Sequence, residues 1–197
     1  NKVRVDPKDL VEKPLDYLRF VISHEGGHRR ISRTEFIPLE QWQELGFSFM
    51  MNAIEDPRDN NFVAESYPNF RDQMKLAYQE DVDFEQKAKA NAKDKLGFQP
   101  RFVRAGFEYI KQWFRETQGE HFAIDETLPQ NVRDALDKTL PSARDSWMRY
   151  PTRAMADGTE HEVYDGVNLT GEKLIQKYAQ TSYEINRDDV WPEFKKL

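Results

Sequence analysis

The spacing of apolar residues is helical over most of the chain. After Pro14, the residues Leu15, Leu18 and Ile22 recur at intervals of three and four, which is the period of one face of an α-helix. Proline fits the first turn of a helix, where its missing N–H costs nothing. The pattern therefore predicts a helix that begins at Pro14 and runs to about Arg30.

The same periodicity predicts helices along the rest of the chain. A second helix starts near Pro38, carries an apolar stripe that includes Trp42 and Phe49, and ends or kinks at Pro57, because proline removes a backbone donor and clashes with the preceding turn. Further helices are predicted at residues 69–95 (one charged helix or a pair), 100–117, 129–139, 141–149 and about 170–187.

Little of the chain favours strands. Residues 31–37 alternate weakly and predict a short strand or an extended loop. Residues 151–168 contain Pro151, Gly158 and Gly166, and their composition predicts a loop. We therefore expect a mainly α protein.

Composition narrows the classes of function. A chain of 197 residues suggests one domain, or a compact domain with an appended lobe. Lys and Arg number 29 against 35 Asp and Glu, a net charge of −6, so no strong positive field favours binding to nucleic acid. No cysteine is present, which excludes disulfides, Cys-based zinc sites, iron–sulfur clusters and thiol nucleophiles. No apolar run is long enough to insert across a bilayer. The compartment stays open, with a slight preference for the cytoplasm.

The sharpest feature is the H-E-x-x-H sequence of His24, Glu25 and His28. Two histidines four residues apart on a helix face the same way and can chelate one Zn²⁺ with bonds of about 2.0–2.1 Å. Glu25 points about 100° around the helix, so it can accept a proton from a metal-activated water without competing for the metal.

Gly26 and Gly27 lie between the two histidines. Glycine inside a helix costs about 1 kcal/mol relative to alanine. The pair therefore predicts a close approach by another backbone or by a substrate; the alternative is a weak point in the helix without a function.

A catalytic zinc usually has three protein ligands and an open fourth position. The third ligand can be a carboxylate or one of the remaining histidines, His121 and His161. We favour Glu55, 27 residues after His28 at the end of the second predicted helix. Its rivals are Glu44, Glu65 and His161.

Other polar residues are candidates for supporting roles. Asp56 and Asp59 can accept the free ring N–H of a ligating histidine and fix its orientation, and Arg58 can hold such a carboxylate in place. For stabilising the oxyanion of a transition state, the candidates lie around the loop-like segment: His161 and Tyr150, with Arg153 and Tyr164.

These motifs resemble the gluzincin zinc metallopeptidases, of which thermolysin is the familiar member. That family combines H-E-x-x-H with E-x-x-x-D, and Glu55 with Asp59 matches the second element. The stretch N-A-I-E-D-P-R also resembles the N-x-x-E-D-x-R signature of a set of predicted bacterial metallopeptidases. The resemblance covers about residues 15–66, a third of the chain. Arg29, Arg30 and Pro57 depart from the family pattern, which has uncharged or apolar residues after the second histidine and no proline within E-x-x-x-D.

The resemblance implies a zincin-like core in residues 1–66, with an H-E-x-x-H helix, a third-ligand helix and a reduced sheet. Residues 67–197 would form a helical lobe that completes a cleft, with both parts in one compact unit. The resemblance assigns these roles: zinc ligands His24, His28 and Glu55, general base Glu25, and supporting carboxylates Asp56 and Asp59.

The resemblance also implies an activity. The chain would be a zinc-dependent peptidase acting on a peptide or protein substrate. The alternative is a catalytically inactive zinc-binding domain of the same kind that serves as a protein-interaction module. A third interpretation is an all-α interaction protein in which the motif arose by chance.

Overall fold

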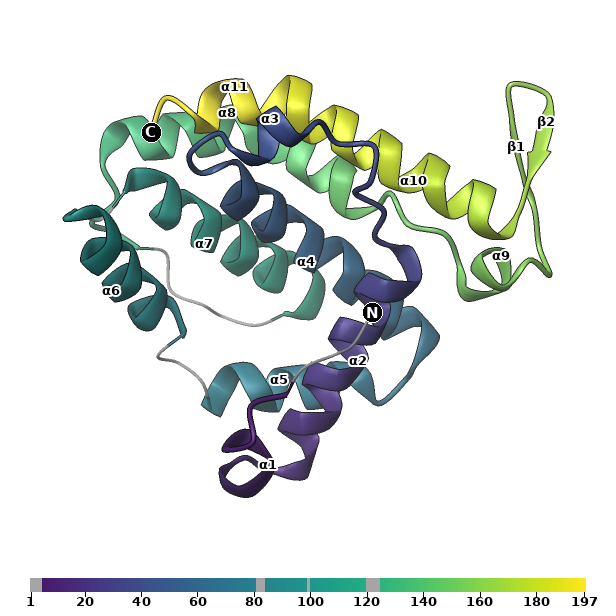
Figure 1. The fold of residues 1–197 in the computed structure, drawn as a ribbon, viewed down its shortest axis with the longest axis horizontal. Helices are drawn as coiled ribbons and strands as arrows, with labels where there is room; N and C mark the ends of the chain where they lie inside the picture. The colour runs from purple at the N-terminus through teal and green to yellow at the C-terminus, as the bar shows by residue number, and fades with distance from the viewer. Residues whose placement is uncertain (1–4, 81–83, 99, 120–124) are drawn as a thin grey trace.

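Helices make up most of the protein, which confirms the mainly α prediction (Figure 1). The computed structural model describes residues 5–80, 84–98, 100–119 and 125–197. Its helical elements are α1 (Asp9–Glu12), α2 (Leu15–Ile31), α3 (Leu39–Trp42), α4 (Phe47–Ser66), α5 (Phe70–Glu80), α6 (Phe84–Leu96), α7 (Arg101–Trp113), α8 (Gln130–Trp147), α9 (Arg153–Asp157), α10 (Gly171–Ile185) and α11 (Trp191–Phe194), with π-helical turns η1 (Phe114–Gln118) and η2 (Asn186–Val190).

The strands of the described residues form one antiparallel hairpin, β1 (Glu162–Tyr164) and β2 (Val167–Leu169). It lies in the segment that the sequence analysis treats as a loop. The turn is Asp165-Gly166, and both residues have positive φ angles, 49° and 78°, as a tight hairpin turn requires. The short strand allowed at residues 31–37 is not formed, since residues 32–38 are a loop.

Two prolines lie inside continuous helices. Pro57 sits in α4, which runs on to Ser66, and Pro141 sits in α8, so the helix does not end at Pro57, and the division of residues 129–149 into two helices is wrong. A proline inside a helix costs about 3 kcal/mol. In α4 half of the residues before Pro57 and most of those after it are buried, and that packing outweighs the local cost.

Helix α4 is the centre of the fold. It packs against α2, α7 and α8, and Figure 1 shows α8, α10 and α11 along one side of the α4–α7 pair, with α2 and α5 on the other. A single hydrophobic cluster joins side chains from both predicted parts of the chain, among them Phe20, Met50, Trp113, Trp147 and Phe194. Residues 1–66 and 67–197 therefore share one core.

Helices α2 and α4 lie close together at Gly27. A Cβ atom there would lie 2.3 Å from Asp59 Oδ1 and 2.4 Å from Val63 Cγ2, distances that no side chain tolerates. A Cβ atom on Gly26 would meet nothing within 4 Å. The close approach predicted from the two glycines is thus made at Gly27, by side chains of α4.

Candidate metal centre

His24 and His28 project from α2 toward α4, where Asp56 faces them. The two Nε2 atoms lie 3.2 Å apart, and Asp56 Oδ1 lies 3.3 Å from His28 Nε2 and 4.0 Å from His24 Nε2. A tetrahedral zinc ion with bonds of about 2.0–2.1 Å separates its ligand atoms by roughly 3.3 Å. The two distances from His28 Nε2 match this spacing, and that between His24 and Asp56 is longer. The three groups could hold one metal ion, and all three are partly exposed, which leaves room for a further ligand from solvent.

The ring of His24 is held by α4. Its Nδ1 lies 2.9 Å from Asn60 Oδ1, and an amide oxygen can only accept a hydrogen bond. Nδ1 therefore carries the proton, and the Nε2 lone pair of neutral His24 faces the cluster. Phe20 stacks on the same ring, with centroids 5.7 Å apart.

Asp59 lies behind His24. Its Oδ2 is 3.4 Å from His24 Nδ1, and neither carboxylate oxygen has a hydrogen-bond partner within the described residues. Burial raises the pKa of Asp59 well above its ordinary value. The position agrees with a carboxylate that supports a ligating histidine from the side opposite the metal.

The structure does not bring Glu55 into the cluster. Its carboxylate accepts hydrogen bonds from Arg58 Nε at 2.8 Å and from the Ser32 hydroxyl at 2.5 Å. Burial alone would raise the pKa of Glu55, but Arg58 and Ser32 outweigh it and lower the pKa. Asp56 occupies the place that the sequence analysis gave to Glu55.

The acidic residues of α4 make the surroundings of the histidine pair negative. Burial alone would lower the pKa of His28, but the hydrogen bond to Asp56 and the charges of Asp59, Asp56 and Glu55 raise it to about 9. Burial lowers the pKa of His24, against the opposing effect of Asp56. A pocket with this charge favours a bound cation.

The remaining predicted site residues lie elsewhere. Glu25 is exposed on α2. Tyr150 donates a hydrogen bond to Glu65 at 2.6 Å, and His161 is exposed just before β1. His121 lies outside the described residues. Within the described residues, the hydroxyl of Tyr150 thus bonds to Glu65 and not to a residue of the histidine–Asp56 cluster.

Two residues that were not predicted from sequence lie beside the histidines. Asn60 contacts His24, and Ser32 Oγ lies 3.0 Å from His28 Nδ1. Each lies four residues after a member of the cluster, Asp56 or His28, and residues at that spacing share a helix face. That spacing was the signal that could have identified both.

Arg30, one of the departures from the gluzincin pattern, has a structural partner. It donates to the carbonyl of Ala156 at 2.7 Å and pairs with Asp157. This contact fastens the end of α2 to α9.

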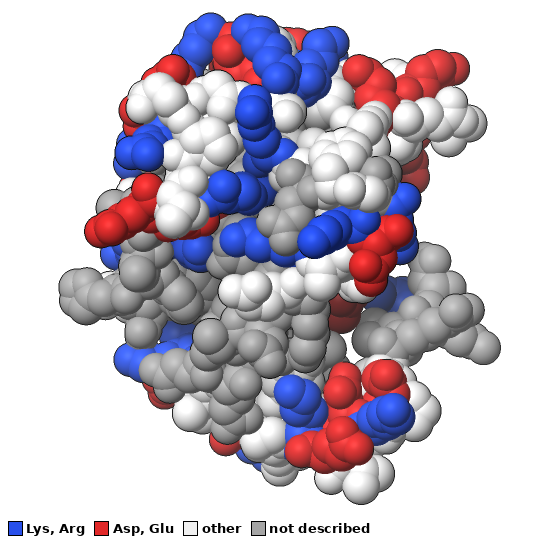
Figure 2. Space-filling model, turned by 90° about the vertical axis from the view of Figure 1, so that its left-hand side faces the viewer, with Lys and Arg blue, Asp and Glu red and all other residues white. Residues whose placement is uncertain are grey.

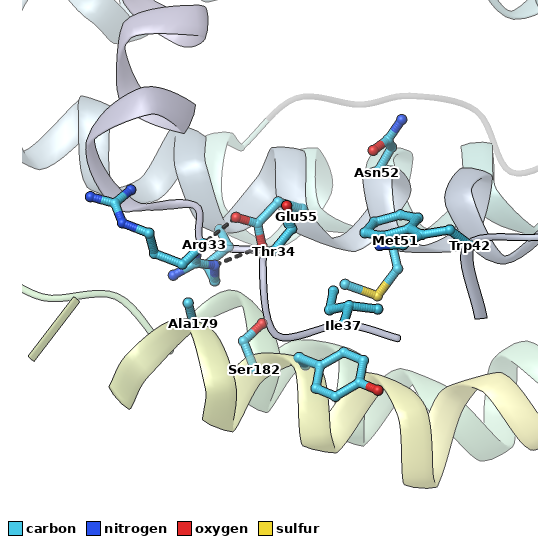
Figure 3. A pocket seen from close by; sticks show the side chains of 11 residues that line it. Arg33, Thr34, Ile37, Trp42, Met51, Asn52, Glu55, Ala179 and Ser182 are labelled. Carbon is cyan, nitrogen blue, oxygen red and sulfur yellow. Dashed lines mark hydrogen bonds and ion pairs between the residues drawn. The ribbon is translucent and has the colours of Figure 1, made fainter. Parts of the chain in front are cut away.

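Glu55 also lines a small cavity (Figure 3). The loop after α2, helix α4 and helix α10 line it, with Arg33, Thr34 and Ser182 among the side chains. Its volume is about 40 Å³, which holds a few water molecules but not a peptide side chain. This cavity is not a substrate cleft.

The surface charge and the helix composition concern binding to charged partners and to membranes. On the face that Figure 2 shows, Lys and Arg side chains lie beside Asp and Glu side chains at both ends of the view. Among the described helices, none has the length and apolar character that crossing a membrane requires.

Comparison with known protein families, with curated proteins and with solved structures finds no match to this chain.

Proposed function

We propose that this chain is a zinc-dependent peptidase, with His24, His28 and Asp56 as metal ligands and Glu25 as general base. The observation that carries the proposal is the convergence of two Nε2 atoms and one carboxylate oxygen at zinc-like spacings. The H-E-x-x-H sequence and the helix that supplies the third ligand support a zincin-like core. Asp56 replaces Glu55 as the ligand of that helix.

Different residues would orient the metal ligands and transfer the proton. A bound Zn²⁺ supplies a Lewis acid that makes water more acidic and polarises a carbonyl. Asn60 and Asp59 orient the His24 ring. Glu25, next to His24 and exposed, accepts the proton of the attacking water and passes it to the leaving amine. A peptide or protein is the substrate class that this division of roles serves.

The first experiment measures zinc content and peptide hydrolysis in parallel. Glu25→Gln should keep one zinc per chain and lose hydrolysis of a quenched peptide library by a factor of about 10²–10⁴, because the shape stays and the proton acceptor is lost. His28→Ala should lose both. Glu40→Gln, at an exposed glutamate of α3, is the matched control and should change neither.

The outcomes separate the two functions that the sequence suggests. A wild-type protein that binds zinc but cleaves no peptide would favour the inactive zinc-binding interaction module. The hydrogen bond of Tyr150 to Glu65 favours that alternative, because it engages the hydroxyl of this candidate electrophile away from the cluster residues. A wild-type protein that binds no zinc would overturn both functions.

A further inference from the structure

A chain of hydrogen bonds connects the His28 ring to a buried ion pair. His28 Nδ1 lies 3.0 Å from Ser32 Oγ, and Ser32 Oγ lies 2.5 Å from Glu55 Oε1. Glu55 is held in turn by the fork of Arg58, whose Nε lies 2.8 Å from Oε2 and whose terminal nitrogen lies 2.5 Å from Oε1. Two helices and the residue that follows α2 contribute to this chain.

Backbone carbonyl groups hold Arg58, the last residue of this series of hydrogen bonds. Arg58 also donates to the carbonyls of Arg149, at 2.8 Å, and Ile31, at 3.3 Å. These contacts occupy the guanidinium on three sides, and its side chain is fully buried. These contacts hold Glu55 with Oε1 directed at Ser32.

The direction of each hydrogen bond follows from the groups involved. An ionised carboxylate only accepts, so the Ser32 hydroxyl donates to Glu55. The Ser32 oxygen then accepts from His28, so the proton of the ring is on Nδ1. When a cation binds, the lone pair of His28 is consequently on Nε2, the atom that faces His24 and Asp56.

We propose that Glu55 is a positioning residue, which acts through Ser32 to hold the His28 ring with Nε2 directed at the metal. The inference rests on the proposed metal site and not on peptide hydrolysis. Neighbouring residues of a helix point about 100° apart. When Asp56 faces the histidines, Glu55 therefore faces Ser32, and one helix supplies both the ligand and the support.

We call the series His28–Ser32–Glu55 the relay. In many metal sites a carboxylate accepts the free N–H of a ligating histidine directly. In the relay the Ser32 hydroxyl lies between the histidine and the carboxylate. Loss of such a partner typically reduces metal affinity 10- to 100-fold. Loss of a ligand costs more, because the ion then loses a bond. The size of the loss therefore distinguishes a positioning Glu55 from a ligating one.

The test measures zinc affinity by competition with a chromophoric chelator, for the full chain. We expect Ser32→Ala to weaken binding 10- to 100-fold and Ser32→Thr, which keeps the hydroxyl, to restore most of it. Asp56→Asn should weaken binding by more than Ser32→Ala. Ser23→Ala, at a serine within α2, serves as the control and should bind as the wild type does.

A double mutant tests whether Glu55 acts through Ser32. Glu55→Gln should weaken zinc binding in the wild-type background and add little in the Ser32→Ala background, because the path is already broken. In the zinc-loaded wild type, ¹⁵N NMR should show His28 bound through Nε2 with the Nδ1 proton retained. In Ser32→Ala that proton should exchange faster with water.

Three results would overturn the relay. One is wild-type affinity in Ser32→Ala. Another is a loss in Glu55→Gln as large as that in Asp56→Asn and unchanged in the Ser32→Ala background, which would make Glu55 a ligand. The third is His28 bound through Nδ1. A wild-type chain that binds no zinc would instead overturn the proposed function, so the two failures are distinguishable.

Discussion

Two arginine–glutamate pairs of the same geometry lie in very different regions of this molecule. At the α2–α4 contact, Arg58 holds Glu55 with two nitrogens, and the side chains are 0% and 14% exposed. Between α8 and η1, Arg144 holds Glu116 in the same forked manner, but the side chains are 45% and 30% exposed. The same forked ion pair is therefore buried in one region and exposed to solvent in the other.

The difference lies in what else each pair touches. Arg58 also binds two backbone carbonyls, and Glu55 also accepts from Ser32 beside a candidate metal ligand. A buried ion pair needs such partners, because removing two charges from water costs several kcal/mol per ion. The surface pair needs none. A buried pair that a fold maintains at this cost indicates a role beyond stability, which here is the orientation of His28.

The largest expected effect is on the buried pair. Arg58→Ala would leave Glu55 buried without its cation and two carbonyls without a donor, so the free energy of unfolding should fall by about 3–5 kcal/mol. Urea unfolding of the metal-free protein measures it. The variant Arg58→Lys should recover only part of the loss, since one ammonium cannot replace the fork. A loss below about 1 kcal/mol would show that the buried pair behaves like a surface one.

A second prediction concerns the close helix contact beside the buried pair. Gly27→Ala should destabilise the protein by about 1–3 kcal/mol, because its Cβ would overlap Asp59 and Val63. Gly26→Ala should be neutral or stabilising by up to about 1 kcal/mol, because alanine favours a helix and the Cβ meets open space.

The two glycine variants control for each other, since they are neighbours on one helix. Thermal unfolding and zinc affinity should both be measured. Gly27→Ala should also weaken zinc binding, because the overlap pushes α4, which carries Asp56, away from the histidines. Equal effects of the two substitutions would mean that the helices do not meet at Gly27.

The helices of this fold could be predicted from sequence where periodicity decides them, and not where packing does. The apolar spacing after Pro14 correctly predicted α2 to within a residue at either end. Pro57 misled the prediction, because a local cost was weighed without the burial around it. The hairpin was missed although Asp165-Gly166 between Tyr164 and Val167 is a strong turn signal.

In the candidate site, too, one part could be predicted from the spacing of residues and another depends on packing. The histidine pair follows from the i, i+4 rule alone, because both residues belong to one helix. The choice between Glu55 and Asp56 depends on how α4 is rotated about its axis, and that rotation is set by contacts with α2, α7 and α8. Sequence spacing predicted the helix turn that faces the histidines and favoured Glu55 on it, whereas the structure places its neighbour Asp56 beside them.

The smallest expected effect is on the surface pair, and it should depend on pH. The hydrogen bond and the charge of Arg144 hold the pKa of Glu116 below its ordinary value. A carboxyl with a lowered folded-state pKa stabilises the fold above its unfolded pKa, about 4.3 for glutamate, and loses that contribution as pH falls through the folded value. Both side chains are exposed, so solvent screening keeps the contribution below about 1 kcal/mol.

Arg144→Ala tests this directly. At pH 7 the variant should be less stable than the wild type by under about 1 kcal/mol, and the gap should narrow as the pH falls below about 4. Added salt should narrow the gap at pH 7 as well, because exposed charges are screened. A gap that does not change with pH would assign the role of Arg144 to packing of its aliphatic stem on η1. A gap as large as that of Arg58→Ala would remove the contrast between the two pairs, since the extra partners of Arg58 would then contribute nothing measurable.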